Sequence, residues 1–259
     1  MGTALITGAS GGIGYELAKL FAKDHHDVIL VARSAVKLQH FGDELRRQFS
    51  ITARALAVDL ASPHAPQTIF NQLQSERTVV DFLVNNAGYG MHGDFAQIPL
   101  EDALGQIQLN IAALTAMTRL FLEPMLQRGQ GRIMNVASTA AFQPGPLMAV
   151  YYASKAFVLS FSEALANEVK ESGVSVTCLC PGPTETGFQE RAHLGNSRLV
   201  RFGMMSAKAV AIDGYQGMLA GKPLVISGFR NWLVAESVRF APRRIATAVS
   251  RKIAEKTTS

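Results

Sequence analysis

The sequence predicts a doubly wound α/β fold: a parallel sheet of about seven strands with helices on both faces. Short apolar segments alternate with helical patterns along the chain. The apolar segments, such as DVILVA and VSVTCLC, are near-continuous runs, which is typical of parallel strands buried on both faces. A glycine-rich turn, GASGGIG, joins the first strand to the first helix. Together these three observations favour an open parallel sheet with one nucleotide-binding edge.

The individual elements follow from the same patterns. The expected strands are TALIT, DVILVA, ARALAV, VVDFLV, GRIMNVAS, VSVTCLC and PLVIS. Ser34 is a suitable N-cap for the second helix. Ser62 suits the N-cap of the third helix, because Pro63 then occupies its first position. Further helices are expected over 100–126, over 148–171 and from about Ser206.

Composition predicts one domain with a short extension. The chain has 259 residues, 48% hydrophobic and 17% charged, which suits one α/β domain over residues 1–228. Residues 182–205 show no periodicity and are expected to form a loop or lid over the substrate. Residues 229–259 contain seven basic and two acidic residues, so this extension carries the whole net charge of +5. The remaining body is neutral, which argues against nucleic-acid binding.

Targeting signals and metal-ligand clusters are not evident in the sequence. No apolar run approaches 18 residues, and the N-terminus lacks the basic and apolar regions of a signal peptide. Cys178 and Cys180 point to the same face of a strand and are interpreted as reduced thiols of a cytoplasmic protein. No metal site is expected.

The glycine turn indicates a dinucleotide cofactor. Gly8, Gly12 and Gly14 allow a tight turn and a close approach of a pyrophosphate to the start of a helix. An acidic residue at the end of the second strand would bind the ribose of NAD, but this position holds Arg33. Arginine suits the adenosine phosphate of NADP. NADP(H) is therefore expected, and NAD(H) is less favoured.

Two adjacent tyrosines and a lysine stand in AVYYASKAF. Tyr151 and Tyr152 lie four and three residues before Lys155, so helical spacing alone lets either tyrosine share a face with the lysine. A lysine beside a phenol favours the phenolate and lowers the pKa of the tyrosine. The same spacing also fits a solvated surface pair.

Taken in order, these motifs resemble the short-chain dehydrogenase/reductase family over about residues 3–227. TGASGGIG is similar to its glycine motif, VDL to its adenine-contacting segment, and NNAG to its central-strand motif. LNIAAL, NVAS, Y-x-x-x-K and PGPTET follow in the family's order. The resemblance implies a Rossmann-like fold, and it selects Tyr151 over Tyr152, because Ser138 precedes Tyr151 by 13 residues.

The resemblance also implies a hydride-transfer site for a carbonyl or secondary alcohol. Tyr151 would be the general acid/base, Lys155 would lower its pKa and bind ribose, Ser138 would position the substrate oxygen, and Asn110 would support a proton relay. Asn110 alternatively satisfies backbone groups only. Besides Tyr151 and Lys155, the implied cofactor-binding residues are Gly8, Ser10, Gly12, Ile13, Gly14, Arg33, Asp59, Leu60, Asn86, Ala87, Gly88, Pro181, Gly182, Thr184 and Thr186.

Substrate and partners are less closely defined. Phe142, Met148 and Phe188 suggest an apolar substrate. His92 and His193 could reach the substrate, or they could be loop histidines exposed to solvent. By analogy with the family, helices near 100–126 and 149–171 would pair in a homodimer or homotetramer. A cofactor-binding regulator, and an epimerase or dehydratase with the same Tyr–Lys pair, are alternatives.

The extension contains a basic amphipathic helix. Ile245, Val249 and Ile253 recur every four residues among Arg243, Arg244, Arg251 and Lys252. Such a helix fits an anionic membrane surface or a partner. It equally fits a helix packed on the body or across a dimer, so these alternatives stay open, with peripheral membrane contact as the hypothesis.

Overall fold

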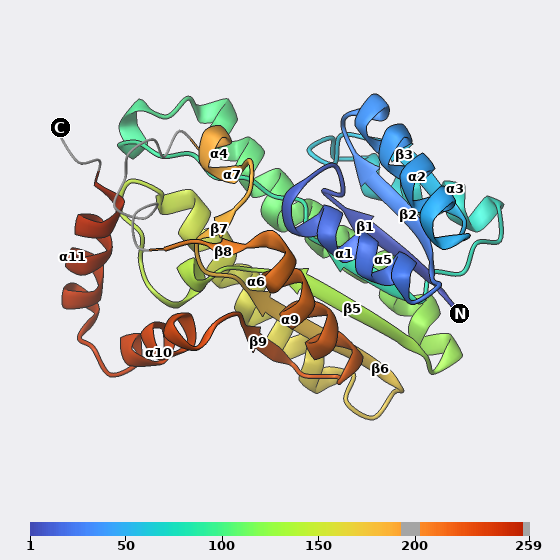
Figure 1. The fold of residues 1–259 in the computed structure, drawn as a ribbon. Helices are drawn as coiled ribbons and strands as arrows, with labels where there is room; N and C mark the ends of the chain where they lie inside the picture. Colours follow the sequence, from blue (N-terminus) through green and yellow to red (C-terminus); the bar gives the residue numbers. More distant parts are fainter. Residues whose placement is uncertain (193–202, 256–259) are drawn as a thin grey trace.

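The predicted doubly wound sheet is confirmed in a computed structural model, which describes residues 1–192 and 203–255 (Figure 1). Seven parallel strands have the order β3-β2-β1-β4-β5-β6-β9. The strand order reverses between β1 and β4, and ligands of open α/β sheets bind outside the carboxyl ends at such a point. The strands are β1 (Thr3–Thr7), β2 (Asp27–Ala32), β3 (Ala53–Ala57), β4 (Phe82–Asn85), β5 (Gly131–Val136), β6 (Val174–Cys180) and β9 (Leu224–Ile226).

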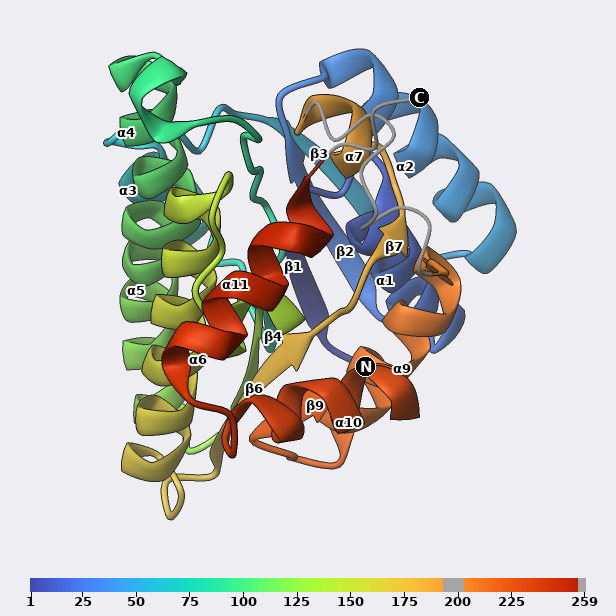
Figure 2. The ribbon, with the colours of Figure 1, turned by 90° about the vertical axis from the view of Figure 1, so that its left-hand side faces the viewer.

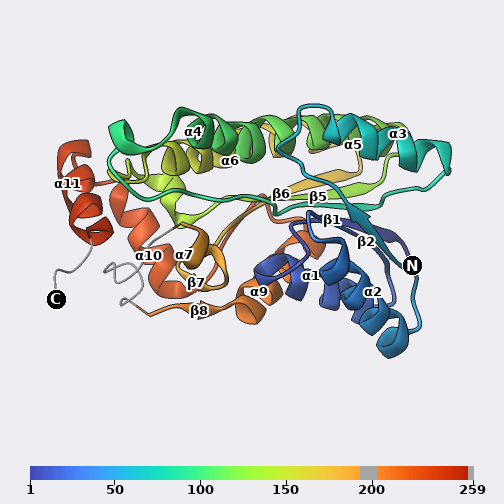
Figure 3. The same cartoon turned by 90° about the horizontal axis from the view of Figure 1, so that it is seen from above.

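Helices cover both faces of the sheet, as Figure 3 shows from above. On one face, Phe21, Leu38 and Met218 of three different helices pack in one apolar cluster with strand residues. On the other face, Ile69 and Phe121 belong to a second cluster of the same kind. The first layer contains α1 (Gly12–Lys23), α2 (Ala35–Phe49) and α9 (Ala207–Leu219), and the second α3 (Ala65–Ser75), α4 (Leu100–Ile107), α5 (Leu114–Arg128) and α6 (Ala149–Glu168).

Of the two predicted N-caps, one is confirmed and the other is wrong. Ser34 accepts a hydrogen bond from the Lys37 amide. Ser62 does not cap α3, which begins at Ala65. Two consecutive turns, closed by hydrogen bonds from the Ser62 amide to the Asp59 carbonyl and from the Ala65 amide to the Ser62 carbonyl, keep this stretch outside the helix.

Two longer helices differ from their expected bounds, and a third does not. A π-helical turn, η2 (Gln108–Ala113), interrupts the helix expected over 100–126 and separates α4 from α5. Such turns frequently mark functional sites, and this one contains Asn110. The helix expected over 148–171 is α6, which ends earlier, at Glu168. The helix expected from about Ser206 is α9, and Ser206 caps it.

The C-terminal segment packs on the body at the carboxyl end of the sheet. It forms α10 (Phe229–Val238) and α11 (Arg243–Ala254). Figure 2 shows α11 crossing in front of the strand ends, between α6 and the segment around α7 (Phe188–Arg191). The His92 Nε2 atom lies 2.8 Å from the Ala254 carbonyl oxygen and joins the last turn of α11 to the loop after β4.

Part of the predicted lid, with His193, lies outside the described residues. The residues on either side form strands rather than the expected loop: β7 (Thr184–Glu185) pairs in parallel with β8 (Met205–Ser206) in a second small sheet. Among the described residues, no helix has the length and apolar character needed to cross a membrane.

Candidate functional site

One cleft of about 2080 Å³ lies at the carboxyl ends of the central strands. Ligand pockets for single small molecules usually occupy about 300–1,000 Å³, so this cleft has room for a dinucleotide and a second molecule together. Its lining extends from Gly8 in the first turn, through Ser138 and Tyr151, to Val249 in α11. The cleft therefore brings together the glycine turn, the C-terminal helices and three of the four predicted catalytic residues, while Asn110 is buried and does not line it.

The glycine turn is held open by backbone conformation and by one asparagine. Gly8 has φ +67°, and a Cβ there would stand 2.7 Å from Asn86 Nδ2. A Cβ on Gly14 would stand 2.5 Å from the same nitrogen and 2.6 Å from the Gly8 carbonyl oxygen. Asn86 Nδ2 donates to the Thr7 carbonyl at 2.9 Å. The turn therefore requires glycine at both positions, and it leaves the start of α1 accessible to a phosphate group.

Basic and polar side chains line the cleft where β2 ends. Arg33 lies there as predicted, and Ser34 and Lys37 line the same part of the cleft. Sequence reasoning used Ser34 only as a cap and missed Lys37, although its place in the first turn of α2 is a signal that was available. Asp59 lines the cleft too, and its Oδ1 accepts from the Ala61 amide at 3.0 Å.

Most of the other predicted cofactor-binding residues also line this cleft. Ser10 is exposed beside the glycine turn, and Leu60 is buried next to Asp59. The remainder comes from the turn, from the loop after β4 and from the segment after β6. These residues are Gly12, Ile13, Asn86, Ala87, Gly88, Pro181, Gly182, Thr184 and Thr186.

A buried polar network supports the loop after β4. Asn85 Nδ2 donates to Thr118 Oγ1 and to Asn135 Oδ1, both at 2.9 Å. Asn135 Nδ2 donates to Ser162 Oγ at 3.0 Å. The first asparagine of NNAG is therefore structural, and it fixes the strand from which Asn86 reaches the glycine turn.

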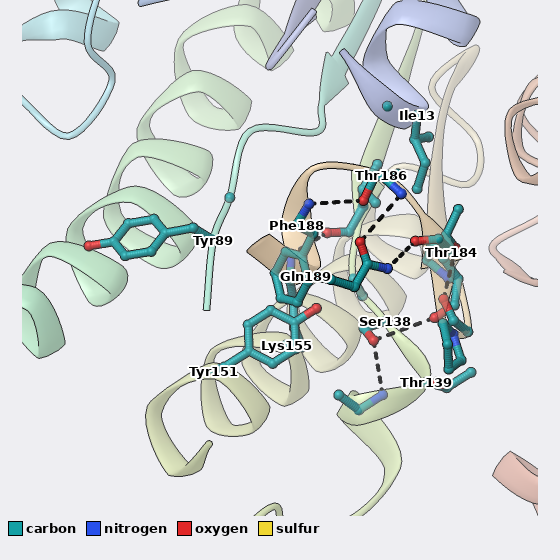
Figure 4. Close-up of a pocket in the computed structure, with 18 of the residues that line it drawn as sticks. Ile13, Tyr89, Ser138, Thr139, Tyr151, Lys155, Thr184, Thr186, Phe188 and Gln189 are labelled. Atoms are coloured by element: carbon teal, nitrogen blue, oxygen red, sulfur yellow. Dashed lines mark hydrogen bonds between the residues drawn. The ribbon is translucent and has the colours of Figure 1, made fainter. Parts of the chain in front are cut away.

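Tyr151 and Lys155 lie together on α6, with Ser138 facing them from the end of β5. Lys155 Nζ stands 5.8 Å from the Tyr151 ring centroid and donates to the Val136 carbonyl at 2.8 Å. Ser138 is near enough to the Tyr151 hydroxyl to lower its pKa, and the Ser138 hydroxyl also donates to the Pro181 carbonyl at 3.4 Å and accepts from the Ala140 amide at 3.1 Å. Figure 4 shows these side chains together, with the Phe188 ring beside Tyr151. Their ring centroids are 5.1 Å apart.

The pKa of Tyr151 is shifted upward, whereas the sequence led us to expect a downward shift. Burial raises the pKa of Tyr151 well above its ordinary value, and the Ser138 side chain opposes that rise only in part. Burial also lowers the pKa of Lys155 from 10.5 to about 8. In the chain by itself, Lys155 is not among the causes that shift the pKa of Tyr151. In the chain without cofactor, Lys155 therefore does not lower the pKa of Tyr151.

Asn110 joins the π-helical turn to the loop after β4. Its Nδ2 donates to the Tyr89 carbonyl at 2.8 Å and to Ser154 Oγ at 3.1 Å, and its Oδ1 accepts from the Tyr89 amide at 3.1 Å. A Cβ on Gly88 would stand 3.0 Å from Asn110 Oδ1 and 3.4 Å from Lys155 Nζ. The side chain therefore satisfies backbone groups, as one alternative expected, and it also lies near Lys155.

The segment after β6 connects the two parts of the cleft. Thr184 Oγ1 donates to the Gly182 carbonyl at 2.8 Å, and Thr186 Oγ1 accepts from the Phe188 amide at 3.2 Å. A Cβ on Gly12 would stand 2.9 Å from Thr186 Cγ2. Figure 4 shows Gln189 between the two threonines, bonded to the Thr184 carbonyl and the Thr186 amide.

Several expectations about the substrate end need correction. Met148 and Phe188 line the cleft as expected. Phe142 does not, and it packs against an apolar cluster that includes Val158 and Cys178. His92 contacts the Ala254 carbonyl and does not line the cleft. The sequence analysis also did not predict that apolar side chains of the two C-terminal helices line the cleft.

These features define a class of protein. A doubly wound parallel sheet, with a glycine turn that opens onto a cleft at the carboxyl edge, is the architecture of dinucleotide-binding α/β proteins. A sequence model of the family described as short chain dehydrogenase matches residues 2–196. The chain belongs to this family, so the predicted membership is confirmed.

Known relatives are similar over most of the chain. A ketoacyl reductase of Nostoc sp. is 32% identical over 81% of this chain and 72% of its own length. The very-long-chain 3-oxoacyl-CoA reductase of Homo sapiens is 34% identical over 69% of this chain, which spans only 58% of that relative. A solved short-chain dehydrogenase from Sphingobium yanoikuyae in complex with NADPH has a TM-score of 0.84 and 32% identity, and the alignment covers 93% of this chain and 94% of that chain.

Proposed function

We propose that this protein is an NADP(H)-dependent oxidoreductase that reduces a carbonyl group or oxidises the corresponding secondary alcohol. The observation that carries this proposal is the placement of Ser138, Tyr151 and Lys155 in the same cleft as the glycine turn. The NADPH complex of a similar short-chain dehydrogenase and the names of the two reductases support the same interpretation.

The residues of the cleft fit NADP(H). The turn at Gly8 and Gly14 leaves no room for a Cβ. Gly12 and Ile13 at the start of α1 line the cleft, where backbone amides would approach a pyrophosphate. Arg33 and Lys37 line the cleft where β2 ends, in position for the additional phosphate that distinguishes NADP from NAD. When bound, this cofactor supplies or accepts the hydride at its nicotinamide ring.

Tyr151 and Ser138 would handle the substrate oxygen. In reduction, a hydride is added at the carbonyl carbon and the Tyr151 hydroxyl gives its proton to the oxygen, which leaves a phenolate. The raised pKa keeps Tyr151 protonated at neutral pH, which is the form that reduction requires. Ser138 would donate a hydrogen bond to the same oxygen and hold it near Tyr151.

Lys155 and Asn110 would restore the proton. With a pKa of about 8, Lys155 is mostly protonated at neutral pH, so that its charge is available to stabilise the Tyr151 phenolate and to bind ribose hydroxyls. Asn110 lies close to Lys155 across Gly88 and would support a relay to solvent. Oxidation of an alcohol uses the same groups in reverse.

The test is an NADPH-oxidation assay with aldehydes, quinones, ketosteroids and 3-ketoacyl thioesters, with NADH in parallel. Tyr151→Phe should lose turnover by about a thousandfold or more, because general acid–base catalysis is removed, and should keep NADPH binding. Turnover in this variant at the wild-type rate would refute the assignment. Cofactor consumption also separates an oxidoreductase from an epimerase or a dehydratase, and from a regulator that only binds NADP.

The substrate class is proposed from the cleft and the relatives together. Apolar residues of α10 and α11 line the part of the cleft away from the glycine turn, which favours an apolar carbonyl compound. The ketoacyl reductases among the relatives act on compounds of that kind by their names. A 3-ketoacyl thioester is therefore the first compound to assay.

Self-association through α4, α5 and α6 is also proposed. Leu100 of α4, Leu126 of α5 and Phe157 of α6 keep 71%, 40% and 39% of their surface exposed, so that a second copy would cover apolar surface. Light scattering of the purified protein should give the mass of a homodimer or homotetramer, and a monomer would exclude the proposal.

Peripheral contact with a membrane surface is also proposed, through residues other than the apolar stripe of α11. The apolar stripe of α11 faces the cleft, so membrane contact would depend on exposed side chains that do not line it, namely Trp232 and Leu233 of α10 and Phe240 in the turn that follows. We place the protein in the cytoplasm, in accordance with the two buried free thiols of β6.

A further inference from the structure

The distal wall of the cleft is an apolar surface that the described part of the protein leaves open. Ile245, Val249 and Ile253 of α11 line the same cleft as Tyr151. Ile245 and Val249 keep 56% and 50% of their surface exposed, even though they belong to the inner side of the helix. Exposed apolar side chains that line a concave site are the usual signature of ligand contact.

One polar group interrupts this apolar wall. Ser250 follows Val249 and also lines the cleft, but it is only 6% exposed. Its hydroxyl has no hydrogen-bond partner among the described residues. An unpaired buried hydroxyl is unfavourable, and such groups call for a specific explanation. A ligand oxygen that reached this hydroxyl from the cleft would supply the missing partner.

A second hydroxyl lies beside it. Tyr152 is 6% exposed and also lines the cleft. Burial raises the pKa of Tyr152, and the Ser250 side chain is near enough to oppose this rise. The geometry between the two side chains nevertheless does not make a hydrogen bond that would satisfy Ser250. Both hydroxyls can donate and accept, so the pair suits either a hydroxyl or a carbonyl oxygen.

The Tyr152 ring is held in this direction by its neighbours. A Cβ on Gly145 would overlap the ring, so the backbone of the loop before α6 packs directly against it. The ring of Tyr151 lies at a centroid distance of 6.1 Å and an angle of 77°. The two adjacent tyrosines thus line one cleft with different neighbours, Ser138 for Tyr151 and Ser250 for Tyr152.

We infer that Ser250 and Tyr152 form a second polar subsite, which binds an oxygen of the substrate while its reacting carbonyl lies at Tyr151. The substrate class is an otherwise apolar carbonyl compound with a second hydroxyl or carbonyl group at a fixed distance from the first. This inference rests on the proposed function for the position of the reacting carbonyl. The subsite itself is defined by binding and is measurable without turnover.

The test uses a long-chain methyl ketone and diketones of the same length, with the second carbonyl at successive positions. Binding to the NADP⁺-loaded protein is measured by calorimetry, and kcat/KM is measured with NADPH. The wild type should prefer one spacing over the simple ketone by about fivefold to tenfold, which is the usual effect of one hydrogen bond. Ser250→Ala should lose this preference, and Ser250→Thr should keep it because its hydroxyl remains.

Thr247→Ala is the matched control, because it also removes a hydroxyl from α11 but at a position that does not line the cleft. The Thr247 hydroxyl donates to the Arg243 carbonyl of its own helix at 2.8 Å. This variant should keep the preference, and Tyr152→Phe should weaken it. No preferred spacing in the wild type, or a preference unchanged in Ser250→Ala, would overturn the subsite. A preferred spacing in binding without NADPH oxidation by any ketone would contradict the proposed function and leave the subsite standing.

Discussion

Replacement of Lys155 by methionine is predicted to stabilise the protein in the absence of cofactor. Lys155 is 5% exposed, and burial lowers its pKa from 10.5 to about 8. At about 1.4 kcal/mol for each pH unit, this difference corresponds to roughly 3 kcal/mol of free energy by which the charged lysine disfavours the folded state at neutral pH. Methionine has a similar shape and removes the charge, but it leaves the Val136 carbonyl without its 2.8 Å hydrogen bond. That loss costs about 1 kcal/mol, so we expect a net gain of about 2 kcal/mol.

The sign of the pH dependence follows from proton binding. Below about pH 8 the lysine is protonated in both the folded and the unfolded chain, and the full penalty is present in the wild type. Between about pH 8 and 10.5 the unfolded chain holds the proton more tightly, so the stability contributed by this group rises with pH. The advantage of Lys155→Met should therefore be largest near pH 7 and should shrink toward pH 10.5.

Urea unfolding of the cofactor-free protein measures both effects. A gain of about 2 kcal/mol should move the midpoint at pH 7 upward by about 1 M. Lys170→Met, which replaces an exposed lysine just after α6, is the control and should leave the midpoint unchanged. A lower midpoint for Lys155→Met at pH 7, or a difference that stays the same at about pH 10, would refute the reasoning. The variant should also lose carbonyl reduction, so that stability and activity change in opposite directions.

Two further predictions concern the cofactor and a membrane surface. Arg33→Ala should weaken NADPH binding by about tenfold and leave NADH binding unchanged, because one charge-assisted contact to a phosphate is lost; Arg47→Ala, near the far end of α2, is the control in fluorescence titrations, and equal losses for both cofactors would contradict the role of Arg33. The protein should co-sediment with vesicles that contain phosphatidylserine at low salt, and release from them should follow added salt. Trp232→Ser should weaken that binding, and sedimentation with neutral vesicles alone would argue against an electrostatic contribution from the tail.

The sheet could be predicted from the sequence because its determinants are local. Each of the seven strands coincides with a near-continuous apolar run, and the glycine turn marks where the first one ends. Ser34 caps its helix as local spacing suggests, and α9 begins where Ser206 indicated. Ser62 follows the same local rule but does not cap, because turns set by Asp59 hold it outside α3.

Features that depend on distant partners were not predictable in the same way. The π-helical turn around Asn110 is accompanied by hydrogen bonds to Tyr89 and Ser154, which are remote in sequence. The position of Tyr151 beside Lys155 on one helix could be predicted from the sequence. The direction of its pKa shift could not, because burial depends on tertiary neighbours such as Phe188 of α7. Local sequence specifies which groups are present, and tertiary packing sets their electrostatics.

The packing of the C-terminal helix could not be predicted from the sequence either. The repeat of Ile245, Val249 and Ile253 specifies an apolar stripe, and any apolar surface satisfies it, whether a membrane, a second copy or the protein's own cleft. In the structure the stripe lines the cleft, and His92 contacts the Ala254 carbonyl at the end of the same helix. Once α11 is there, the tyrosine next to Tyr151 faces a serine of the tail. Consecutive residues on a helix point about 100° apart, so a Tyr–Tyr pair lets one helix serve two parts of a single cleft. The adjacent tyrosines therefore link the proposed chemistry at Tyr151 to the choice of substrate at Tyr152 and Ser250.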